Sequence, residues 1–310
     1  MGIPQDYSFT RYLAAKKSVD DRALNRRVWE CLAGQLPKGR PSGPLRVLEI
    51  GAGIGTMVER MLERNLVGYT QYTALDALAE NMTCARERLT GWGKAHGYRV
   101  SSRANRLIIS NLDQKVSVYF ENREAFEFAR QVGSQRQWDL LVAHAFLDLV
   151  DLSSGLHPLF RLLRDGGSFY FSANFDGMTA FEPPFEPDLE RQILELYHRS
   201  MDLRRVDGRP SGDSHTGRRL FQQIPLAGGE ILEAGSSDWV VYPRRNGYPE
   251  DEAYFLHFIL HTIYKELYGH PQLDPERLAA WAAERHAQVE KGQLVYLAHQ
   301  LDFTGRFPKG

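Results

Sequence analysis

The sequence predicts an α/β fold built on one doubly wound sheet, and three observations lead to this expectation. The first is the short apolar run Leu45–Ile50, which is typical of a buried parallel strand. The second is the glycine-rich turn at 51–56, which is followed by apolar residues at helical spacing. The third is that strand-like and helix-like segments alternate as far as residue 175, a pattern typical of a parallel sheet covered by helices on both faces.

The expected elements of this region follow one another closely. The strands are rich in apolar residues, and they cover 45–50, 69–75, 116–120, 138–143 and 168–174. The helices carry apolar residues at helical spacing, and they begin at 57 and cover 82–92, 125–132 and 156–163. Beyond 175 the alternation ends, and we expect helices at 188–204, 216–226, 249–270 and 275–291, a polar loop at 205–217, strand-like stretches at 231–242 and a terminal strand at 293–303.

The N-terminal segment reads as a separate helical cover. Residues 7–36 have helical character, and the Pro and Gly cluster at 37–44 separates them from the first strand. Ser18 is the expected N-cap of the helix that carries Leu24 and Val28. We therefore expect a helical cover at 1–40 and a sheet domain at 41–310, with cap insertions near 176–215 and 246–292.

Composition narrows the functional class. The 310 residues include 38 Lys+Arg and 39 Asp+Glu, a net charge of −1 that gives no general attraction to nucleic acid. Cys31 and Cys84 are too few for a disulfide framework or a structural zinc site. No run of 18 apolar residues occurs, and the N-terminus lacks the apolar core of a signal peptide. We expect a cytoplasmic protein without membrane insertion; its oligomeric state stays open.

The glycine turn carries the strongest chemical signal. Glycines after a buried strand let a ligand approach the backbone, and the following helix offers free N–H groups. Asp76 ends the next expected strand, 21 residues after Gly55. A carboxylate about 20 residues beyond such a turn is typical of one that binds ribose hydroxyls. The spacing therefore predicts a nucleotide-like cofactor.

Two residues choose between cofactors. A dinucleotide site needs Gly or Ala where this chain has Thr56. Glu49, just ahead of the turn, favours a cofactor with a cationic amino group or sulfonium over one that carries phosphates. The sequence thus favours S-adenosylmethionine, and NAD is the disfavoured alternative.

The segment 49–55, Glu-x-Gly-x-Gly-x-Gly, resembles the first motif of class I S-adenosylmethionine-dependent methyltransferases. The similarity covers roughly residues 45–175 and extends to Asp76, to Glu124-Ala125, to 138–144 and to the Asp-Gly-Gly-Ser turn at 165–168. The segment 216–220 is similar, less specifically, to the small-molecule branch related to quinone-biosynthesis methyltransferases. The resemblance implies a Rossmann-like, seven-stranded methyltransferase sheet and methyl transfer to a small-molecule acceptor enclosed under a helical cap.

The resemblance also implies cofactor roles. Glu49 and the turn would hold the methionine end, the turn residues being Gly51, Ala52, Gly53 and Gly55. Asp76 would accept the ribose hydroxyls, and Glu124 with Ala125 would approach the adenine amino group. Many relatives have Asp where this chain has Glu124, so Asn122 or Arg123 is an alternative adenine neighbour.

His144 is the best-placed titratable group for catalysis. It follows the fourth strand directly, and ligands of open α/β sheets lie beyond the carboxyl ends of the strands. It could remove a proton near neutral pH, contact the cofactor or substrate, or pack structurally. Asp148 and Asp151 are interpreted as helix-start acids.

Five residues are candidates for substrate binding. Asn174 follows the fifth strand, and Arg218 lies in the first turn of an expected helix. His257, His261 and Tyr264 fall on one helical face, where they could line a pocket or pack under the cap. Phe258 stands where a His-Glu-x-x-His zinc motif needs glutamate, so no metal is expected.

Two rival functions remain. The chain could be a non-catalytic S-adenosylmethionine-binding regulatory or partner protein. A nucleic-acid base methyltransferase is disfavoured by the neutral charge and by 143–146, which lack an Asn/Asp-Pro-Pro-Tyr-like motif. The accepting atom, whether O, N, C or S, is not determined by the sequence.

Overall fold

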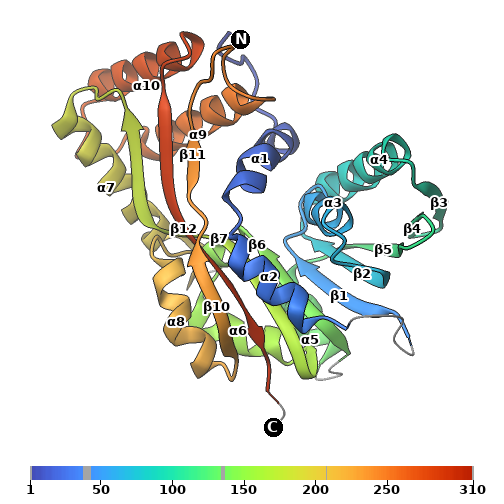
Figure 1. Cartoon of the computed structure of the whole chain (residues 1–310). Coiled ribbons are helices and arrows are strands. Elements are labelled where there is room, and N and C mark those ends of the chain that lie inside the picture. Colours follow the sequence, from blue (N-terminus) through green and yellow to red (C-terminus); the bar gives the residue numbers. More distant parts are fainter. Residues whose placement is uncertain (1, 38–42, 134–136, 207, 309–310) are drawn as a thin grey trace.

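The computed structural model describes residues 2–37, 43–133, 137–206 and 208–308 (Figure 1). Its centre is a ten-stranded sheet in the order β10-β12-β7-β6-β1-β2-β5-β4-β3, with β11 paired to β12. Most of the Pro and Gly cluster at 37–44, and with it the boundary expected at 40/41, lies outside the described residues. The alternation of strands and helices up to residue 175 is confirmed, and so is the doubly wound α/β class.

The five central strands run parallel. They are β1 (Leu45–Ile50), β2 (Tyr69–Asp76), β5 (Lys115–Asn122), β6 (Trp138–His144) and the first part of β7 (Leu163–Glu182). β12 (Val295–Arg306) pairs antiparallel with β7, and β10 (Glu230–Ser236) pairs antiparallel with β12. Apolar side chains on both faces of β1 are fully buried, as expected for a central parallel strand.

Chain order reverses between β1 and β6. From β1 the chain winds one way through β2 and β5, and from β6 it winds the other way through β7. Ligands of doubly wound sheets bind beyond the carboxyl ends of the strands at such a switch point. The topology therefore directs attention to the edge where Ile50, Asp76 and His144 end their strands.

Helices cover both faces of this sheet, and each face has its own apolar core. The first core includes side chains from α2 (Arg26–Gln35), α3 (Thr56–Glu63) and α4 (Ala79–Ala95). The second includes side chains from α5 (Ala125–Val132), α6 (Leu152–Phe160) and α8 (Thr216–Leu226). Burial of these two sets of apolar surface is what holds the sheet between its helices.

A third apolar core joins the N-terminal helix to the later helices. It packs α1 (Phe9–Ala23) with α7 (Pro187–Leu203), α9 (Glu252–Leu267), α10 (Pro275–Glu290) and β11 (Trp239–Val241). Figure 1 shows α1 between α9 and the α3–α4 side of the sheet. Two segments far apart in the sequence, the N-terminal cover and the residues after 246, therefore form one body above the strand ends.

The helical cover begins earlier than expected. Ser8, and not Ser18, is the N-cap of α1, since its side chain accepts a hydrogen bond from the backbone N–H of Arg11. Ser18 lies inside α1, where its hydroxyl donates to Glu252 at 2.7 Å. The second helix, α2, starts after Asn25, whose side chain caps it by accepting from Arg27 and Val28. The prediction of Ser18 as a cap was therefore wrong, because an interhelical partner satisfies its hydroxyl.

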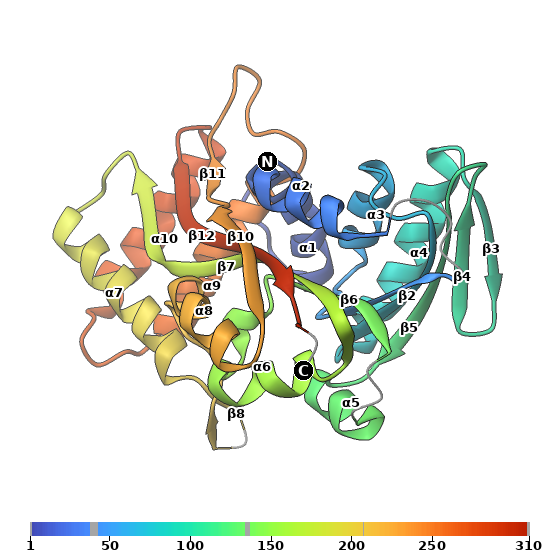
Figure 2. The ribbon, with the colours of Figure 1, turned by 60° about the horizontal axis from the view of Figure 1, so that its bottom comes forward.

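Three strands extend the sheet beyond the seven expected. The hairpin of β3 (Arg99–Arg103) and β4 (Arg106–Ser110) adds an edge beside β5, at the opposite end from β10 (Figure 2). β11 pairs with the first part of β12. The expected loop at 205–217 also contains a short hairpin of β8 (Arg205–Val206) and β9 (Arg209–Pro210), which forms its own small sheet.

The fifth expected strand is much longer than predicted. β7 continues to Glu182, so Asn174 lies within the strand and not in a turn after it. The reason is β12, which pairs with β7 along both its parts, from Arg306 opposite Ser168 to Val295 opposite Glu182. This extended pair carries the sheet past the carboxyl ends of the other strands and forms a wall beside them.

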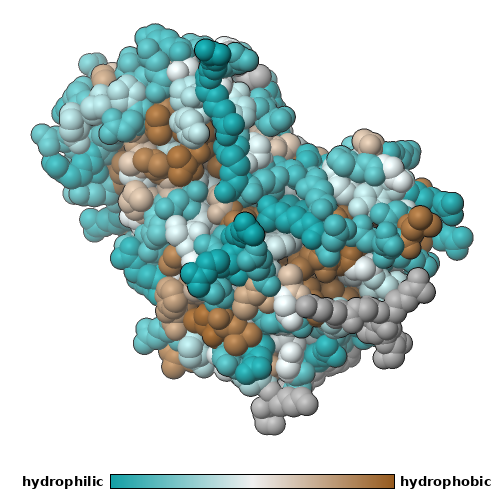
Figure 3. Space-filling model, in the orientation of Figure 1, coloured by the Kyte–Doolittle hydropathy of each residue, from teal (hydrophilic) through white to brown (hydrophobic). Residues whose placement is uncertain are grey.

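The polarity of the surface and of the helices agrees with the amino-acid composition. The face in Figure 3 is mostly hydrophilic, and its apolar areas are separate from one another. Within the described ranges, no helix is long and apolar enough to cross a membrane.

Candidate functional site

A cavity of about 1380 Å³ lies at the carboxyl ends of the parallel strands. Its wall on one side comes from the turn after β1, the end of β2 and the start of α5. On the other side it is lined by α1, the end of β6, the extended part of β7, α7, β11 and β12. Ligand pockets usually measure roughly 300–1,000 Å³. This volume is large enough for a cofactor and a second small molecule together.

The turn after β1 has the backbone that the glycines predict. Gly51, Gly53 and Gly55 all have positive φ, at 65°, 53° and 80°. A Cβ at Gly51 would overlap the ring of Phe146, which follows β6. Glycine at this position therefore lets the turn come close to the neighbouring strand end. Gly51, Ala52 and Gly53 line the cavity, whereas Gly55 is the N-cap of α3 and packs against α4.

Asp76 fixes the turn from the neighbouring strand. Its Oδ2 accepts a hydrogen bond from the Gly53 N–H at 2.9 Å, and its Oδ1 accepts from Leu78 N–H and the Asn81 amide. A carboxylate offers about four acceptor sites, and the described residues occupy three of them, which leaves one on Oδ2 for a ligand hydroxyl. Asp76 lines the cavity, as its expected role requires, and it also orders the turn and the start of α4.

Glu49 lies on β1 with 2% of its surface exposed, and it also lines the cavity. The Tyr72 hydroxyl donates a hydrogen bond to its Oε2 at 2.8 Å. Burial raises the pKa of Glu49 to about 8, although Tyr72 and Arg60 act to lower it. A buried carboxyl group with a raised pKa ionises more readily when a cation binds beside it, because the cation favours the charged form.

The start of α5 carries two candidates for the adenine contact that the sequence analysis expects. Glu124 is the N-cap of α5 and lines the cavity, with its Oε2 accepting from the Glu127 N–H. Arg123 also lines the cavity, and its guanidinium lies over the ring of Phe128. Asn122 does not line the cavity, because its amide donates to the carbonyl oxygens at 76 and 77.

His144 ends β6 inside the cavity, with both ring nitrogens engaged. Nδ1 lies 2.9 Å from the Ser172 hydroxyl, and Nε2 lies 2.8 Å from Asp20 Oδ2. Burial lowers the pKa of His144 to about 4, and Lys16 acts in the same direction. The ring is therefore neutral at pH 7, and its Nε2 also lies 3.3 Å from the Lys16 ammonium. This geometry suits a His144 side chain that contacts a ligand in the cavity better than one that removes a proton from it. Catalysis by His144 stays an untested prediction.

Asp20 is the centre of a buried polar cluster on α1. Its carboxylate accepts from Lys16 at 2.6 Å, from the Trp239 indole at 2.9 Å and from Arg60 at 3.3 Å. Burial alone would raise the pKa of Asp20, but Lys16, His144 and Arg60 outweigh it and hold that pKa well below its usual value. The carboxylate is thus a fixed negative charge that joins α1 to the sheet.

Sequence reasoning missed the contribution of α1. Tyr12, Lys16 and Asp20 line the cavity from one helical face, although their i, i+4, i+8 spacing could have indicated this. The strands that these side chains face could not be identified from the sequence, because they begin more than a hundred residues later.

Asp148 and Asp151 both lie at helix starts, as expected. Asp148 is in the first turn of the short helix η1 (Leu147–Leu149), and it also lines the cavity. Asp151 is the N-cap of α6.

The five predicted substrate-binding residues do not line the cavity. Asn174 donates to the Leu301 carbonyl oxygen, and Arg218 forms an ion pair with Asp176. His257 is fully buried against His286, with their Nδ1 atoms 2.8 Å apart. The remaining two contact other aromatic rings outside the cavity: His261 stacks on Tyr7, and Tyr264 packs near Tyr268. Substrate binding by these five residues stays an untested prediction, and our proposal rests on cavity residues instead.

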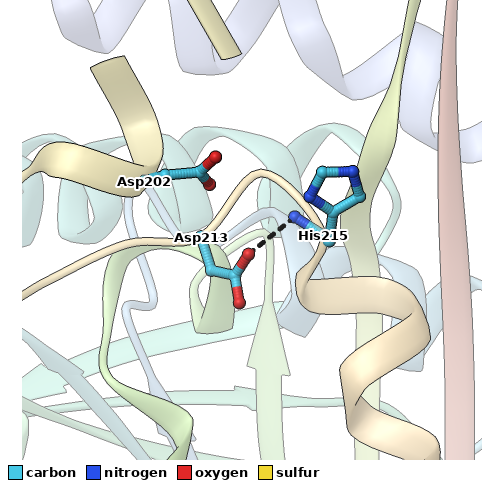
Figure 4. Close-up of side chains that lie close together, drawn as sticks. All are labelled: Asp202, Asp213 and His215. Atoms are coloured by element: carbon cyan, nitrogen blue, oxygen red, sulfur yellow. Dashed lines mark hydrogen bonds between the residues drawn. The ribbon is translucent and has the colours of Figure 1, made fainter. Parts of the chain in front are cut away.

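One group of potential metal ligands comes together within the described ranges: Asp202, Asp213 and His215. Figure 4 shows the Asp213 carboxylate turned to the backbone N–H of His215, a contact of 2.8 Å. The same carboxylate pairs with Arg219 at 2.6 Å, while Asp202 accepts from the Ser214 N–H. Hydrogen bonds and an ion pair within the protein already explain this grouping.

Comparison with known proteins places the fold. No protein-family model matches the sequence, and no curated protein matches it significantly. Among solved structures, a protein from Anaeromyxobacter dehalogenans, provisionally described as a type II methyltransferase, is similar with a TM-score of 0.50 and 16% identity, over 93% of this chain and 99% of that one. A protein from Galdieria sulphuraria, provisionally described as a sarcosine dimethylglycine methyltransferase, gives 0.41 and 14%, over 96% and 86%. Geranyl diphosphate C-methyltransferase from Streptomyces coelicolor gives 0.42 and 10%, over 90% and 74%. The likeness is one of fold, that of Rossmann-like methyltransferases.

Proposed function

We propose that this protein binds S-adenosylmethionine and transfers its methyl group to a small-molecule acceptor. The observation that carries the proposal is the joint position of Glu49, the glycine turn and Asp76 along one wall of the cavity. These residues come from two adjacent parallel strands, and they meet at the switch point of a methyltransferase-type sheet.

The donor groups fit the cofactor from end to end. Glu49 offers a buried carboxyl group to the ammonium of the methionine end, and the backbone at 51–53 offers close approach. The free acceptor site on Asp76 Oδ2 suits one ribose hydroxyl. Glu124 Oε1, which has no hydrogen bond among the described contacts, could accept from the adenine amino group. Arg123 could instead place its guanidinium along the adenine ring.

When bound, S-adenosylmethionine supplies a methyl group already activated on a sulfonium. The protein then has to align the acceptor and exclude water. His144 suits this task as a neutral wall residue, locked by Asp20 and Ser172. The cavity continues from the cofactor wall to α7 and β12 without a break, which favours an enzyme over a non-catalytic binding protein. The small-molecule branch related to quinone-biosynthesis methyltransferases is one candidate for the group to which this chain is related.

Isothermal titration calorimetry with S-adenosylhomocysteine tests the proposal, with NAD⁺ as the comparison ligand. We expect saturable binding of S-adenosylhomocysteine with one site per chain and no binding of NAD⁺. Asp76→Ala should abolish binding, whereas Asp113→Ala, which removes an exposed carboxylate elsewhere, should leave it unchanged. Binding of NAD⁺ alone, or no binding of either ligand, would contradict the proposal.

A further inference from the structure

The cavity contains a carboxylate oxygen without a hydrogen-bond partner. Asp148 Oδ1 is buried, and it forms no hydrogen bond with any of the described residues. A buried acceptor without a donor costs on the order of 1–3 kcal/mol or more, so such an atom points to a donor supplied from outside the chain. Because Asp148 lines the cavity, a ligand in the cavity can supply it.

Aromatic side chains line the same cavity. Tyr12 from α1, Tyr197 from α7 and Tyr296 from β12 all line it, as do Phe175 and Trp239. Burial raises the pKa of Tyr12, Tyr197 and Tyr296; the charge of Asp148 acts in the same direction on Tyr12 and Tyr197, and Tyr197 does so on Tyr296. No hydrogen bond within the described ranges engages the three phenol hydroxyls. We call these five aromatic residues with Asp148 the acceptor chamber.

Two cationic groups act to lower the pKa of Asp148, although neither forms an ion pair with it among the described residues. Lys16 faces the chamber from α1, but its ammonium is paired with Asp20 at 2.6 Å. Arg204, the C-cap of α7, acts on Asp148 electrostatically without forming an ion pair with it in the part of the chain described here. The Tyr12 ring is stacked on Phe258, and the Lys16 ammonium already lies over the Trp239 ring. A carboxylate with an aromatic ring such as Tyr197 nearby suits an ammonium, because the negative charge and the ring quadrupole both attract it.

We infer that the methyl acceptor is an amine, whose protonated nitrogen binds in the acceptor chamber and donates to Asp148 Oδ1. This inference rests on the proposed methyltransferase function and names the substrate class of that same cavity. A phenol or alcohol would satisfy Oδ1 equally well, but only an ammonium also brings a full positive charge to the Asp148 carboxylate.

The same contact provides the proton acceptor that an amine needs. An ammonium has no lone pair, so one N–H bond must break before nitrogen can accept a methyl group. The proton moves to Asp148 Oδ1, where an O–H bond forms, and the electron pair stays on nitrogen. Burial raises the pKa of the Asp148 carboxyl, which brings it closer to neutral pH and makes it a better proton acceptor. The proton returns to solvent after the product leaves.

Calorimetry with three probes of one ring and different head groups tests the inference. Benzylamine is cationic at neutral pH, benzyl alcohol is neutral and benzoate is anionic. Each is titrated into the full-length protein saturated with S-adenosylhomocysteine, whose own binding is measured first. We expect benzylamine to bind most tightly and benzoate to bind least. Failure of S-adenosylhomocysteine to bind would overturn the proposed function, whereas its binding without preference for benzylamine would overturn the amine inference alone.

Variants identify the contacts. Asp148→Asn should weaken benzylamine at least about tenfold and leave benzyl alcohol unchanged, since a hydrogen bond to a charged group is worth more than a neutral one. Asp151→Asn is the matched control, because its carboxylate oxygens already accept from Ser153 and Ser154. It should bind benzylamine as the unmodified protein does.

A second pair of variants tests the aromatic faces. Tyr197→Ala should weaken benzylamine binding. Tyr197→Phe should bind benzylamine as the unmodified protein does, because a cation is attracted by the aromatic ring and not by the hydroxyl. The inference is overturned if Asp148→Asn leaves benzylamine affinity unchanged, or if benzoate or benzyl alcohol binds more tightly than benzylamine. Retained binding of S-adenosylhomocysteine in every variant shows that the fold is intact.

Discussion

The imidazole of His144 lies 2.8 Å from the Asp20 carboxylate, so the end of β6 is hydrogen-bonded to helix α1 across the cavity. Asp20 in turn bonds to Trp239 on β11. Three segments distant in sequence therefore meet at one buried carboxylate. This cluster makes the N-terminal helix part of the cavity wall and not a detachable cover.

Asp20→Ala should be strongly destabilising. Removing this carboxylate leaves Lys16 and Arg60, two buried cations, without one of their partners. Breaking a buried ion pair in this way typically costs about 3–5 kcal/mol of unfolding free energy. Chemical denaturation measures the change. The control Glu30→Ala breaks an exposed pair with Arg26 and should have little effect. Equal losses in the two variants would contradict a special role for Asp20.

Gly51→Ala should both destabilise the protein and weaken S-adenosylhomocysteine binding. The added methyl would overlap Phe146, and the positive φ of 65° is unfavourable for alanine. We expect a loss of about 1–2 kcal/mol.

The matched control is Gly34→Ala, in the last turn of α2, where a methyl group would meet nothing within 4 Å. That substitution should stabilise the helix by up to about 1 kcal/mol. Thermal unfolding distinguishes the two, and stabilisation by both substitutions would show that the turn at 51 is not tightly packed.

Glu49 should make cofactor binding depend on pH. Its pKa of about 8 means that the carboxyl is mostly protonated at neutral pH before binding. An ammonium beside it would favour the ionised form, so binding releases a proton. We expect S-adenosylhomocysteine affinity to rise between pH 6 and 7.5, by up to about tenfold per pH unit.

Calorimetry in buffers of different ionisation enthalpy counts the released protons. Glu49→Gln should bind more weakly at pH 7.5 and show a flat pH profile over the same range. A variant that keeps the slope of the unmodified protein would place the proton release elsewhere.

The buried pair of His257 and His286 should reduce stability in acid. Burial lowers the pKa of each to about 4, below the ordinary value of 6.5. The unfolded chain therefore takes up protons first as the pH falls, and stability is lost between about pH 6.5 and 4. His286→Gln removes one such group.

Between pH 7.5 and 5, the stability of the unmodified protein relative to His286→Gln should fall by about 2 kcal/mol. Urea unfolding at both pH values measures this difference. The variant His96→Gln, at an exposed position, controls for the loss of a histidine as such. A difference that does not change with pH would show that the pair is not held neutral.

The cofactor wall could be predicted from sequence because its residues are local. Glu49, the glycine turn and Asp76 lie at the ends of adjacent strands, and strand ends follow from the apolar pattern. The site residues expected there, with the exception of Gly55, all line the cavity.

The opposite wall could not be predicted, because long-range pairing forms it. β12 extends β7 past Asn174, and helix α1 docks from the other end of the chain. Lys16 and Tyr296 meet the same cavity although 280 residues separate them in the sequence. No local periodicity in the sequence predicts such a contact. His257, which the sequence placed there, instead contacts His286 in the core between α9 and α10.

A crystal structure with S-adenosylhomocysteine tests the central claim most directly. The account predicts the ligand along the carboxyl ends of β1 and β2, with its ammonium at Glu49, a ribose hydroxyl within hydrogen-bond distance of Asp76 Oδ2, and its sulfur facing the acceptor chamber. A ligand bound outside this cavity, or one whose sulfur faces away from Asp148, would contradict the account.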